Sequence, residues 1–182
     1  MSETLLEKIS EVLNKKGIEY IVIGGQAVLV YGYARFTNDI DVLIGTDITQ
    51  IGLVNEICEE FGLTRLKDDE FTRKTNVVPL FDQNTNFRAD LIFCFTDFER
   101  EAINRAVTTV KNGVPVRFAT VEDLILMKLY ASRAVDIEDI KKLLMLNKNI
   151  DLEHVYKWLT RFDEDPESNL TKKFKNIIES IK

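Results

Sequence analysis

Residues 21–44 decide the fold, and they read Ile-Val-Ile-Gly-Gly-Gln-Ala-Val-Leu-Val-Tyr-Gly-Tyr-Ala-Arg-Phe-Thr-Asn-Asp-Ile-Asp-Val-Leu-Ile. Residues 19–23 are short, apolar and rich in β-branched side chains, which predicts a buried strand. A glycine pair follows at once, and residues 26–34 then have the apolar spacing of a helix. Residues 39–45 predict a second strand, which carries two aspartates.

The glycine pair, Gly24 and Gly25, lies where the predicted strand meets the predicted helix. Glycines let backbone amides come close to a ligand, and the N-terminus of a helix favours phosphate. Two interpretations stay open from these residues alone. The pair is either a phosphate-binding turn or a tight turn with no ligand.

Asp39 and Asp41 are two residues apart on the second predicted strand. Because side chains alternate along a strand, both carboxylates lie on one face, and Ile40 and Val42 point into the core. Two like charges on one face repel each other, and a divalent cation between them would explain the pattern. Mg²⁺ prefers a few carboxylates together with phosphate oxygens of a substrate. The alternative is a solvated strand edge.

A third carboxylate, Asp90, lies near the start of the strand candidate at residues 87–95. If this strand lies beside residues 39–45, Asp90 completes a cluster of three carboxylates. Two metal ions held in this way could clamp the attacking and leaving oxygens of a phosphoryl transfer.

Asp82 is the competitor of Asp90, eight residues earlier in the chain. The polar residues 83–86 follow it and predict a hairpin loop. Asp90 instead enters an apolar strand, where a lone charge is costly unless it is paired or bound to metal. The sequence therefore favours Asp90 as the functional carboxylate and assigns Asp82 to the turn.

The whole chain is predicted to be α/β (α+β), with a mixed sheet flanked by helices and a C-terminal helical part. We expect an α/β core at residues 1–119 and a helical part at residues 120–182. The predicted elements are helices at residues 4–16, 47–61 and 97–106, strands at residues 63–66, 77–81 and 114–118, a polar turn at residues 67–76, and helices from residue 120, from Asp136 to about 146, over 151–162, and over 167–181 with Pro166 at its start.

The composition excludes several functions. The 182 residues include 24 basic and 30 acidic ones, so a net charge of -6 argues against a general nucleic-acid coat. Cys58 and Cys94 are expected to be buried free thiols. His154 is the one histidine, which excludes His-rich zinc sites, and it is predicted to be solvated. Catalysis would fall mainly to carboxylates, lysines and arginines.

Targeting signals are not expected in this sequence. Its first residues have no positive region followed by an apolar stretch, and no apolar run approaches the ~18 residues that a membrane span needs. We therefore predict a cytoplasmic protein with no membrane partner.

Together these residues resemble the nucleotidyltransferase superfamily, the fold of DNA polymerase beta and antibiotic-adenylating enzymes. The glycine pair, a helix and then Arg35-x-Thr37-x-Asp39-x-Asp41 is most similar to bacterial nucleotidyltransferase toxins of abortive-infection type toxin–antitoxin systems and their uncharacterised relatives. One departure is the glycine pair itself, because many superfamily members have Gly-Ser there. Without the hydroxyl, backbone amides alone are left to contact phosphate.

A later segment is similar to the family's helical Lys…Arg…Asp…Asp signature. It contains Lys128, Arg133, Asp136 and Asp139. The resemblance implies that Lys128 reaches a triphosphate and that Asp139 or Asp136 supports the site. From the residues alone, Asp136 is equally well a helix cap. The resemblance covers roughly residues 19–45, 88–95 and 120–145.

The resemblance implies an enzyme that moves a nucleoside monophosphate from an NTP such as ATP to an acceptor hydroxyl. Asp39, Asp41 and Asp90 would be catalytic and bind Mg²⁺, with two ions expected, and Asp90 would also help to deprotonate the acceptor. The nucleotide-binding residues would be Gly24, Gly25, Arg35, Thr37, Lys128 and Asp139.

The acceptor and partners are left open by the sequence. A tRNA or another RNA is one acceptor, as in toxin–antitoxin systems with an antitoxin protein as partner. An RNA acceptor would require a basic strip, for which the mid-chain candidates are Arg65, Lys67, Arg73 and Lys74. An acidic surface suits a cationic, antibiotic-like small molecule better. A third alternative is a non-catalytic module that binds nucleotide or a partner.

Overall fold

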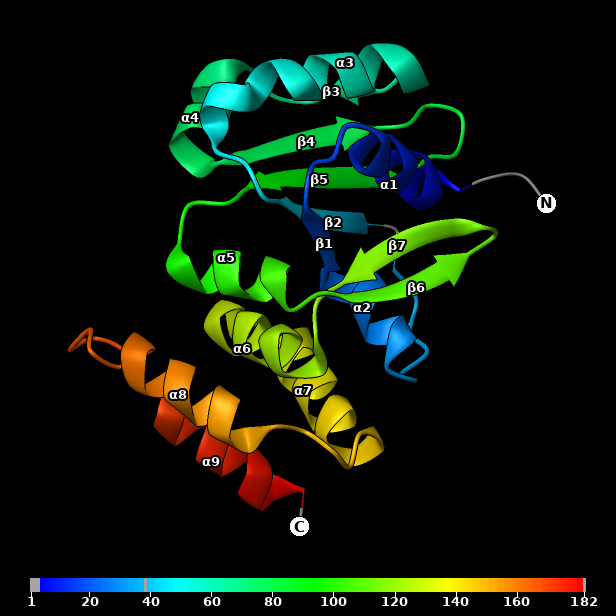
Figure 1. Ribbon diagram of the computed structural model, residues 1–182. Coiled ribbons are helices and arrows are strands. Elements are labelled where there is room, and N and C mark those ends of the chain that lie inside the picture. The colour runs from blue at the N-terminus through cyan, green and yellow to red at the C-terminus, as the bar shows by residue number, and fades with distance from the viewer. Residues whose placement is uncertain (1–3, 38, 182) are drawn as a thin grey trace. The chain divides into compact units, whose positions relative to one another are not determined.

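A computed structural model describes residues 4–37 and 39–181 (Figure 1). The elements are α1 (Leu5–Lys15), β1 (Tyr20–Ile23), α2 (Gly24–Val30), β2 (Asp39–Ile44), a 3₁₀ turn (Ile48–Gln50), α3 (Ile51–Phe61), β3 (Thr64–Arg65), α4 (Asp69–Thr75), β4 (Val77–Phe81), β5 (Arg88–Phe93), α5 (Asp97–Asn104), β6 (Val107–Lys111), β7 (Val114–Phe118), α6 (Val121–Ala131), α7 (Ala134–Leu146), α8 (Leu152–Phe162) and α9 (Leu170–Ser180). This confirms the predicted α/β class.

The strands form a seven-stranded mixed sheet in the order β3-β4-β5-β2-β1-β7-β6. β2 is central: it runs parallel to β5 on one side and antiparallel to β1 on the other. β1 in turn runs parallel to β7. Helix α5 packs beside β1 and β2, and α1 packs beside β7.

Burial along β2 changes from one end to the other. Ile40, Val42 and Ile44 are buried on one face, as alternation predicts. On the other face Asp39 is exposed, Asp41 is half-buried and Leu43 is buried. The strand therefore enters the core from its first residue inward, and its acidic face opens where the strand begins.

Two segments of the α/β part differ from the prediction. Residues 67–76 were expected to be a turn, but they contain α4, capped by the Asp68 carboxylate, which accepts a hydrogen bond from the Phe71 amide at 2.9 Å. The sequence interpretation also missed β6, which pairs antiparallel with β7. Most of β6 is exposed, so it lacks the apolar alternation that would have indicated a strand.

Two helix starts in the C-terminal part also differ. Helix α7 begins at Ala134 with Arg133 as its cap, so Asp136 lies in the first turn and does not precede the helix. Helix α9 begins at Leu170, and Pro166 lies before it, outside the helix. Asp163 supplies the cap-like contacts there, because its carboxylate accepts hydrogen bonds from the Leu170 and Thr171 amides.

The chain packs as two compact units. One comprises the described residues up to Gln26 together with Phe36–Ala119, and the other comprises Ala27–Arg35 with the residues from Thr120 onward. In the second unit α6 contacts α7, α8 and α9, and α8 lies beside α9. The domain boundaries given above stay predictions, because compactness alone does not establish that a part folds independently.

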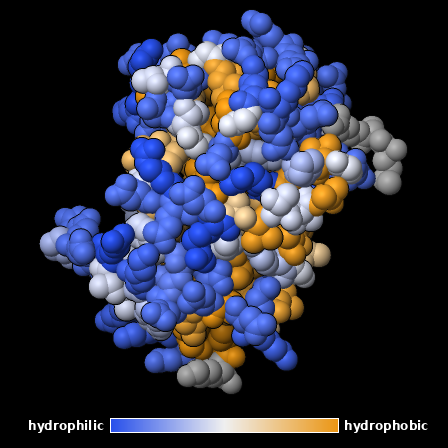
Figure 2. All heavy atoms as spheres, viewed as in Figure 1, coloured by the Kyte–Doolittle hydropathy of each residue, from blue (hydrophilic) through white to orange (hydrophobic). Residues whose placement is uncertain are grey.

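The surface and the thiols agree with a well-formed core. Hydrophilic side chains cover most of the face drawn in Figure 2. Within the described ranges, no helix is both long and apolar enough to cross a membrane. Cys58 and Cys94 are free thiols, as predicted, and burial raises the pKa of both.

Candidate functional site

The three candidate carboxylates lie on neighbouring strands. β2 and β5 pair in parallel, with Asp41 opposite Asp90 and Asp39 opposite Arg88. Residues that are opposite each other in a sheet point to the same face, and so do residues two apart on one strand. Asp39, Asp41 and Asp90 therefore share one face of the sheet, as the sequence required for a carboxylate cluster.

Gly24 is shaped by its contact with Asp41. Its φ is +63°, in the left-handed region that favours glycine. A Cβ built at Gly24 would lie 1.8 Å from Asp41 Oδ2, so any side chain there would displace the carboxylate. The first glycine of the pair thus has a steric function at the candidate site, and its role in binding triphosphate stays a prediction.

The electrostatics of Asp90 reflect its neighbours. Burial raises the pKa of Asp90, and the charge of Asp39 raises it further, while Arg88 opposes both. The carboxylate is therefore held on the face at an electrostatic cost, which a bound cation would offset.

These carboxylates fit a metal ion only in part. In residues 4–37 and 39–181, no three His, Cys, Asp or Glu side chains are arranged to hold one ion together. Mg²⁺ is commonly bound by one or two carboxylates, with water and substrate phosphates completing its shell. The opposed pair Asp41 and Asp90, with Asp39 beside them, fits that kind of site when a phosphate is present.

Thr37 and Arg35 precede the acidic strand and make different contacts. Thr37 Oγ1 donates a hydrogen bond to the Asp39 carbonyl at 3.3 Å, which ties the loop to the start of β2. Arg35 belongs to the helical unit, where its Nε lies 3.1 Å from Asp139 Oδ1. Their predicted roles in nucleotide binding stay predictions.

Lys128 is buried in the helical unit and is held by two aspartates. Its Nζ lies 2.6 Å from Asp139 Oδ2 and 3.2 Å from Asp136 Oδ1. Arg133 Nε also donates to Asp136 Oδ2 at 2.6 Å. Burial raises the pKa of Asp136, but the Arg133 hydrogen bond and the Lys128 charge outweigh this and hold it below its ordinary value. The cluster thus matches its own charges, while the triphosphate role of Lys128 and Asp139 stays a prediction.

The prediction that His154 is solvated was wrong. Its side chain is 7% exposed, and its Nε2 lies 2.7 Å from Asp123 Oδ1. Thr120 Oγ1 donates to the other oxygen of Asp123 at 2.7 Å. The sequence did carry a signal, because His154 is next to Val155 and one turn before Trp158, on the buried side of α8.

The argument that separated Asp82 from Asp90 was wrong in its reason. Asp82 is 4% exposed and is more buried than Asp90. Its carboxylate accepts hydrogen bonds from the Asn84 amide at 2.9 Å and from Thr85 Oγ1 at 2.7 Å, so the predicted turn is present. Burial raises the pKa of Asp82, but these hydrogen bonds outweigh it and lower the pKa. Strand register, and not burial, distinguishes Asp90.

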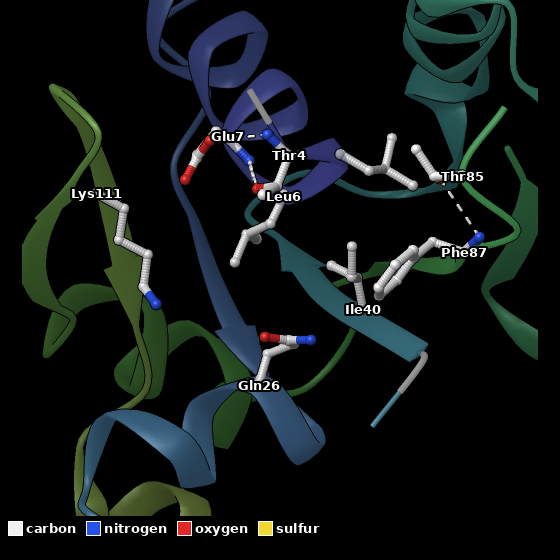
Figure 3. A pocket seen from close by; sticks show the side chains of 9 residues that line it. Thr4, Leu6, Glu7, Gln26, Ile40, Thr85, Phe87 and Lys111 are labelled. Atoms are coloured by element: carbon white, nitrogen blue, oxygen red, sulfur yellow. Dashed lines mark hydrogen bonds between the residues drawn. The ribbon is translucent and has the colours of Figure 1, made fainter. Parts of the chain in front are cut away.

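A pocket of about 280 Å³ lies within the α/β unit (Figure 3). Ile40 lines it, and Ile40 points to the opposite side of β2 from Asp39 and Asp41. The pocket is therefore separate from the carboxylate face. Its walls consist of Thr4, Leu5, Leu6, Glu7, Gln26, Ile40, Thr85, Phe87 and Lys111.

A mixed sheet, a strand–glycine–helix turn and paired aspartates on the next strand define a nucleotidyltransferase fold. The chain belongs to the family described as "Nucleotidyltransferase of unknown function (DUF6036)", whose sequence model matches residues 3–182. The protein is thus a transferase of the nucleotidyltransferase class. No curated protein sequence matches it.

Solved structures agree with this fold. The chain is similar to the antibiotic-resistance enzyme ANT(2'')-Ia in complex with adenylyl-2''-tobramycin, with 18% identity, 88% of this chain and 95% of that chain covered, and a TM-score of 0.60. It is also similar to an antigenic nucleotidyltransferase-like protein of Paracoccidioides brasiliensis (18% identity, 92% and 90% covered, TM-score 0.56). The lincomycin-bound lincosamide adenylyltransferase LnuA is a third match (17%, 81% and 100%, 0.54). At these identities the likeness concerns the fold alone.

Proposed function

We propose that this protein transfers a nucleoside monophosphate from an NTP to an acceptor hydroxyl in a Mg²⁺-dependent reaction. The observation that carries the proposal is the register of β2 and β5, which sets Asp41 opposite Asp90 with Asp39 on the same face. An acidic face of this kind suits divalent cations and the phosphates they neutralise.

The step forms one bond and breaks one. The acceptor oxygen attacks the α-phosphorus of the NTP, and the bond from that phosphorus to the bridging oxygen of pyrophosphate breaks. Asp90 takes the acceptor proton, for which its raised pKa is suited. Mg²⁺, when bound, neutralises charge on the phosphates and pyrophosphate.

The binding roles fall to residues around this face. Asp39 and Asp41 hold the metal, and Gly24 leaves the space that the Asp41 carboxylate occupies. The backbone of Gly24 and Gly25 faces phosphate, together with Arg35, Thr37, Lys128 and Asp139 as the family resemblance implies.

The acceptor is either a small molecule or an RNA. Two of the similar structures carry antibiotics or their adenylylated products in their titles, which supports a small-molecule acceptor. A tRNA acceptor, with an antitoxin protein as partner, has weaker support from the mid-chain basic residues. Arg65 is already paired with Asp69 at 2.6 Å and bonded to Asn55, which leaves fewer charges for a strip.

The test is incubation of the pure protein with Mg²⁺ and each labelled NTP. One set of reactions contains total cellular RNA and the other contains a panel of aminoglycosides and lincosamides. Label on RNA or on a drug supports transfer and names the acceptor class, and omission of Mg²⁺ should remove it. NTP binding without label on any acceptor would favour the non-catalytic module.

A further inference from the structure

Arg88 places a positive charge on the acidic sheet face. It is the first residue of β5, lies opposite Asp39 and is two residues before Asp90, so its side chain shares their face. Among the described residues of β1, β2, β4 and β5, the other side chains on this face are apolar or acidic. They are Ile21, Ile23, Asp39, Asp41, Leu43, Val77, Pro79, Phe81, Asp90 and Ile92.

The guanidinium of Arg88 is available to a ligand. Arg88 is exposed, and it forms no ion pair or hydrogen bond with any residue that the structure describes. Asp39 lies directly opposite, yet the two side chains do not come within ion-pair distance. Ion pairing with Asp39 therefore does not account for an arginine at this position.

We propose that Arg88 binds a phosphate group of a substrate beside Asp90. A guanidinium presents a planar fork of donors that matches phosphate oxygens in pairs. Positions two apart on a strand are about 6.6 Å apart, so a phosphate on Arg88 lies next to the group that Asp90 activates. This inference rests on the proposed nucleotidyl transfer and narrows its substrates, because the same charge repels a polycationic acceptor.

The phosphate has two sources, the NTP and a phosphate-bearing acceptor, and binding measurements distinguish them. Calorimetry with Ca²⁺ in place of Mg²⁺ would follow ATP, GTP, CTP and UTP, with the matching nucleosides as phosphate-free probes. Fluorescence anisotropy would follow a short RNA. The variants are Arg88→Ala and Arg88→Lys, and the matched control is Arg73→Ala, an exposed arginine on α4.

If Arg88 binds the NTP, Arg88→Ala weakens NTP binding about 10- to 100-fold and leaves nucleoside binding unchanged. If it binds the acceptor, RNA affinity falls by that factor and NTP affinity does not. Arg88→Lys should retain part of either effect, because it keeps the charge and loses the fork. Arg88→Ala affinities equal to those of Arg73→Ala for every phosphate-bearing probe would overturn the proposal.

The same measurements distinguish this inference from the proposed function. Wild-type protein that binds NTP but labels no acceptor contradicts nucleotidyl transfer, while the binding comparison still decides the role of Arg88. Wild-type protein that transfers label with no change in Arg88→Ala, in binding or in transfer, contradicts the Arg88 inference alone.

Discussion

Two acidic clusters in this protein treat their charges in opposite ways. On the sheet face, the charge of Asp39 raises the pKa of Asp90, so the acids repel each other. In the helical unit, Lys128 binds both Asp136 and Asp139, and the pKa of Asp136 is lowered. Both clusters contain acids separated by one or two residues, and their neighbours alone make the difference.

The difference indicates which cluster needs a ligand. Retained repulsion lowers stability and gains nothing for folding, so a bound cation is the natural explanation of the sheet face. A buried cluster that matches its own charges needs nothing from outside, and its loss should first be seen in stability. The predictions below test this contrast, beginning with the largest expected effect.

Asp41→Asn should lower transfer by about 10³-fold or more, because a neutral amide is a poor ligand for a hard cation and metal neutralisation is worth several kcal/mol. The free energy of unfolding without metal should stay equal or rise, since one repelling charge is gone. Steady-state transfer assays and urea unfolding would measure both. Full activity would refute the metal-site assignment.

Asp90→Asn should lower transfer by about 10²- to 10⁴-fold while Mg²⁺–NTP binding through Asp39 and Asp41 is kept, because the acceptor proton loses its base. Asp82→Asn is the matched control. It should keep transfer, and we expect a loss of about 1 kcal/mol in unfolding free energy, because two hydrogen bonds to its carboxylate weaken.

The two phenotypes are separated by measuring transfer and urea unfolding on both variants. If Asp82→Asn loses transfer and Asp90→Asn keeps it, the site has to be redrawn around the turn at Asp82.

Lys128→Met should destabilise the protein by about 3 kcal/mol, since it leaves two aspartates in a buried position with one cation fewer. Lys142→Met is the control, because the exposed Lys142–Glu138 pair at 3.7 Å should contribute less than about 0.5 kcal/mol. Chemical denaturation would measure both variants. Equal stabilities, with NTP use weakened in Lys128→Met alone, would assign Lys128 to the triphosphate and end the contrast.

Local patterns predicted the parts of this fold that depend on local sequence. Alternation put Asp39 and Asp41 on one face, but it could not establish that β5 lies beside β2, so Asp90 was conditional. The importance of Arg88 comes from the same pairing and has no local signal. His154 and Asp123 are 31 positions apart in the chain, and their contact depends on the packing of two helices.

Weak patterns produced the remaining differences. Helix α4 is short and almost entirely polar, with Thr72 as its buried residue, so it resembles a turn in sequence. The charge-matched cluster around Lys128 also could not be read from spacing. The signature indicated that these residues belong together, but whether they face a ligand or each other depends on burial.

The smallest effect concerns a carboxylate that is satisfied without a cation. Asp163 accepts hydrogen bonds from Ser168 Oγ at 2.6 Å and from the Leu170 and Thr171 amides at 2.8 and 3.0 Å. Burial raises its pKa slightly, but these hydrogen bonds outweigh it and lower the pKa to about 2. It therefore extends the contrast to a third case, in which backbone donors match the charge at the start of α9.

Asp163→Ala should lower the free energy of unfolding by roughly 1–2 kcal/mol at neutral pH. Because the folded-state pKa is depressed, the stabilisation is fully present above the unfolded value of about 3.9 and is lost as pH falls toward about 2. The difference between variant and wild type in urea unfolding should therefore shrink over that range. Asp165→Ala, which removes a single contact to the Glu167 amide, should change stability by less than about 0.5 kcal/mol. A pH-independent difference for Asp163→Ala would mean that the loss comes from packing and not from the charge.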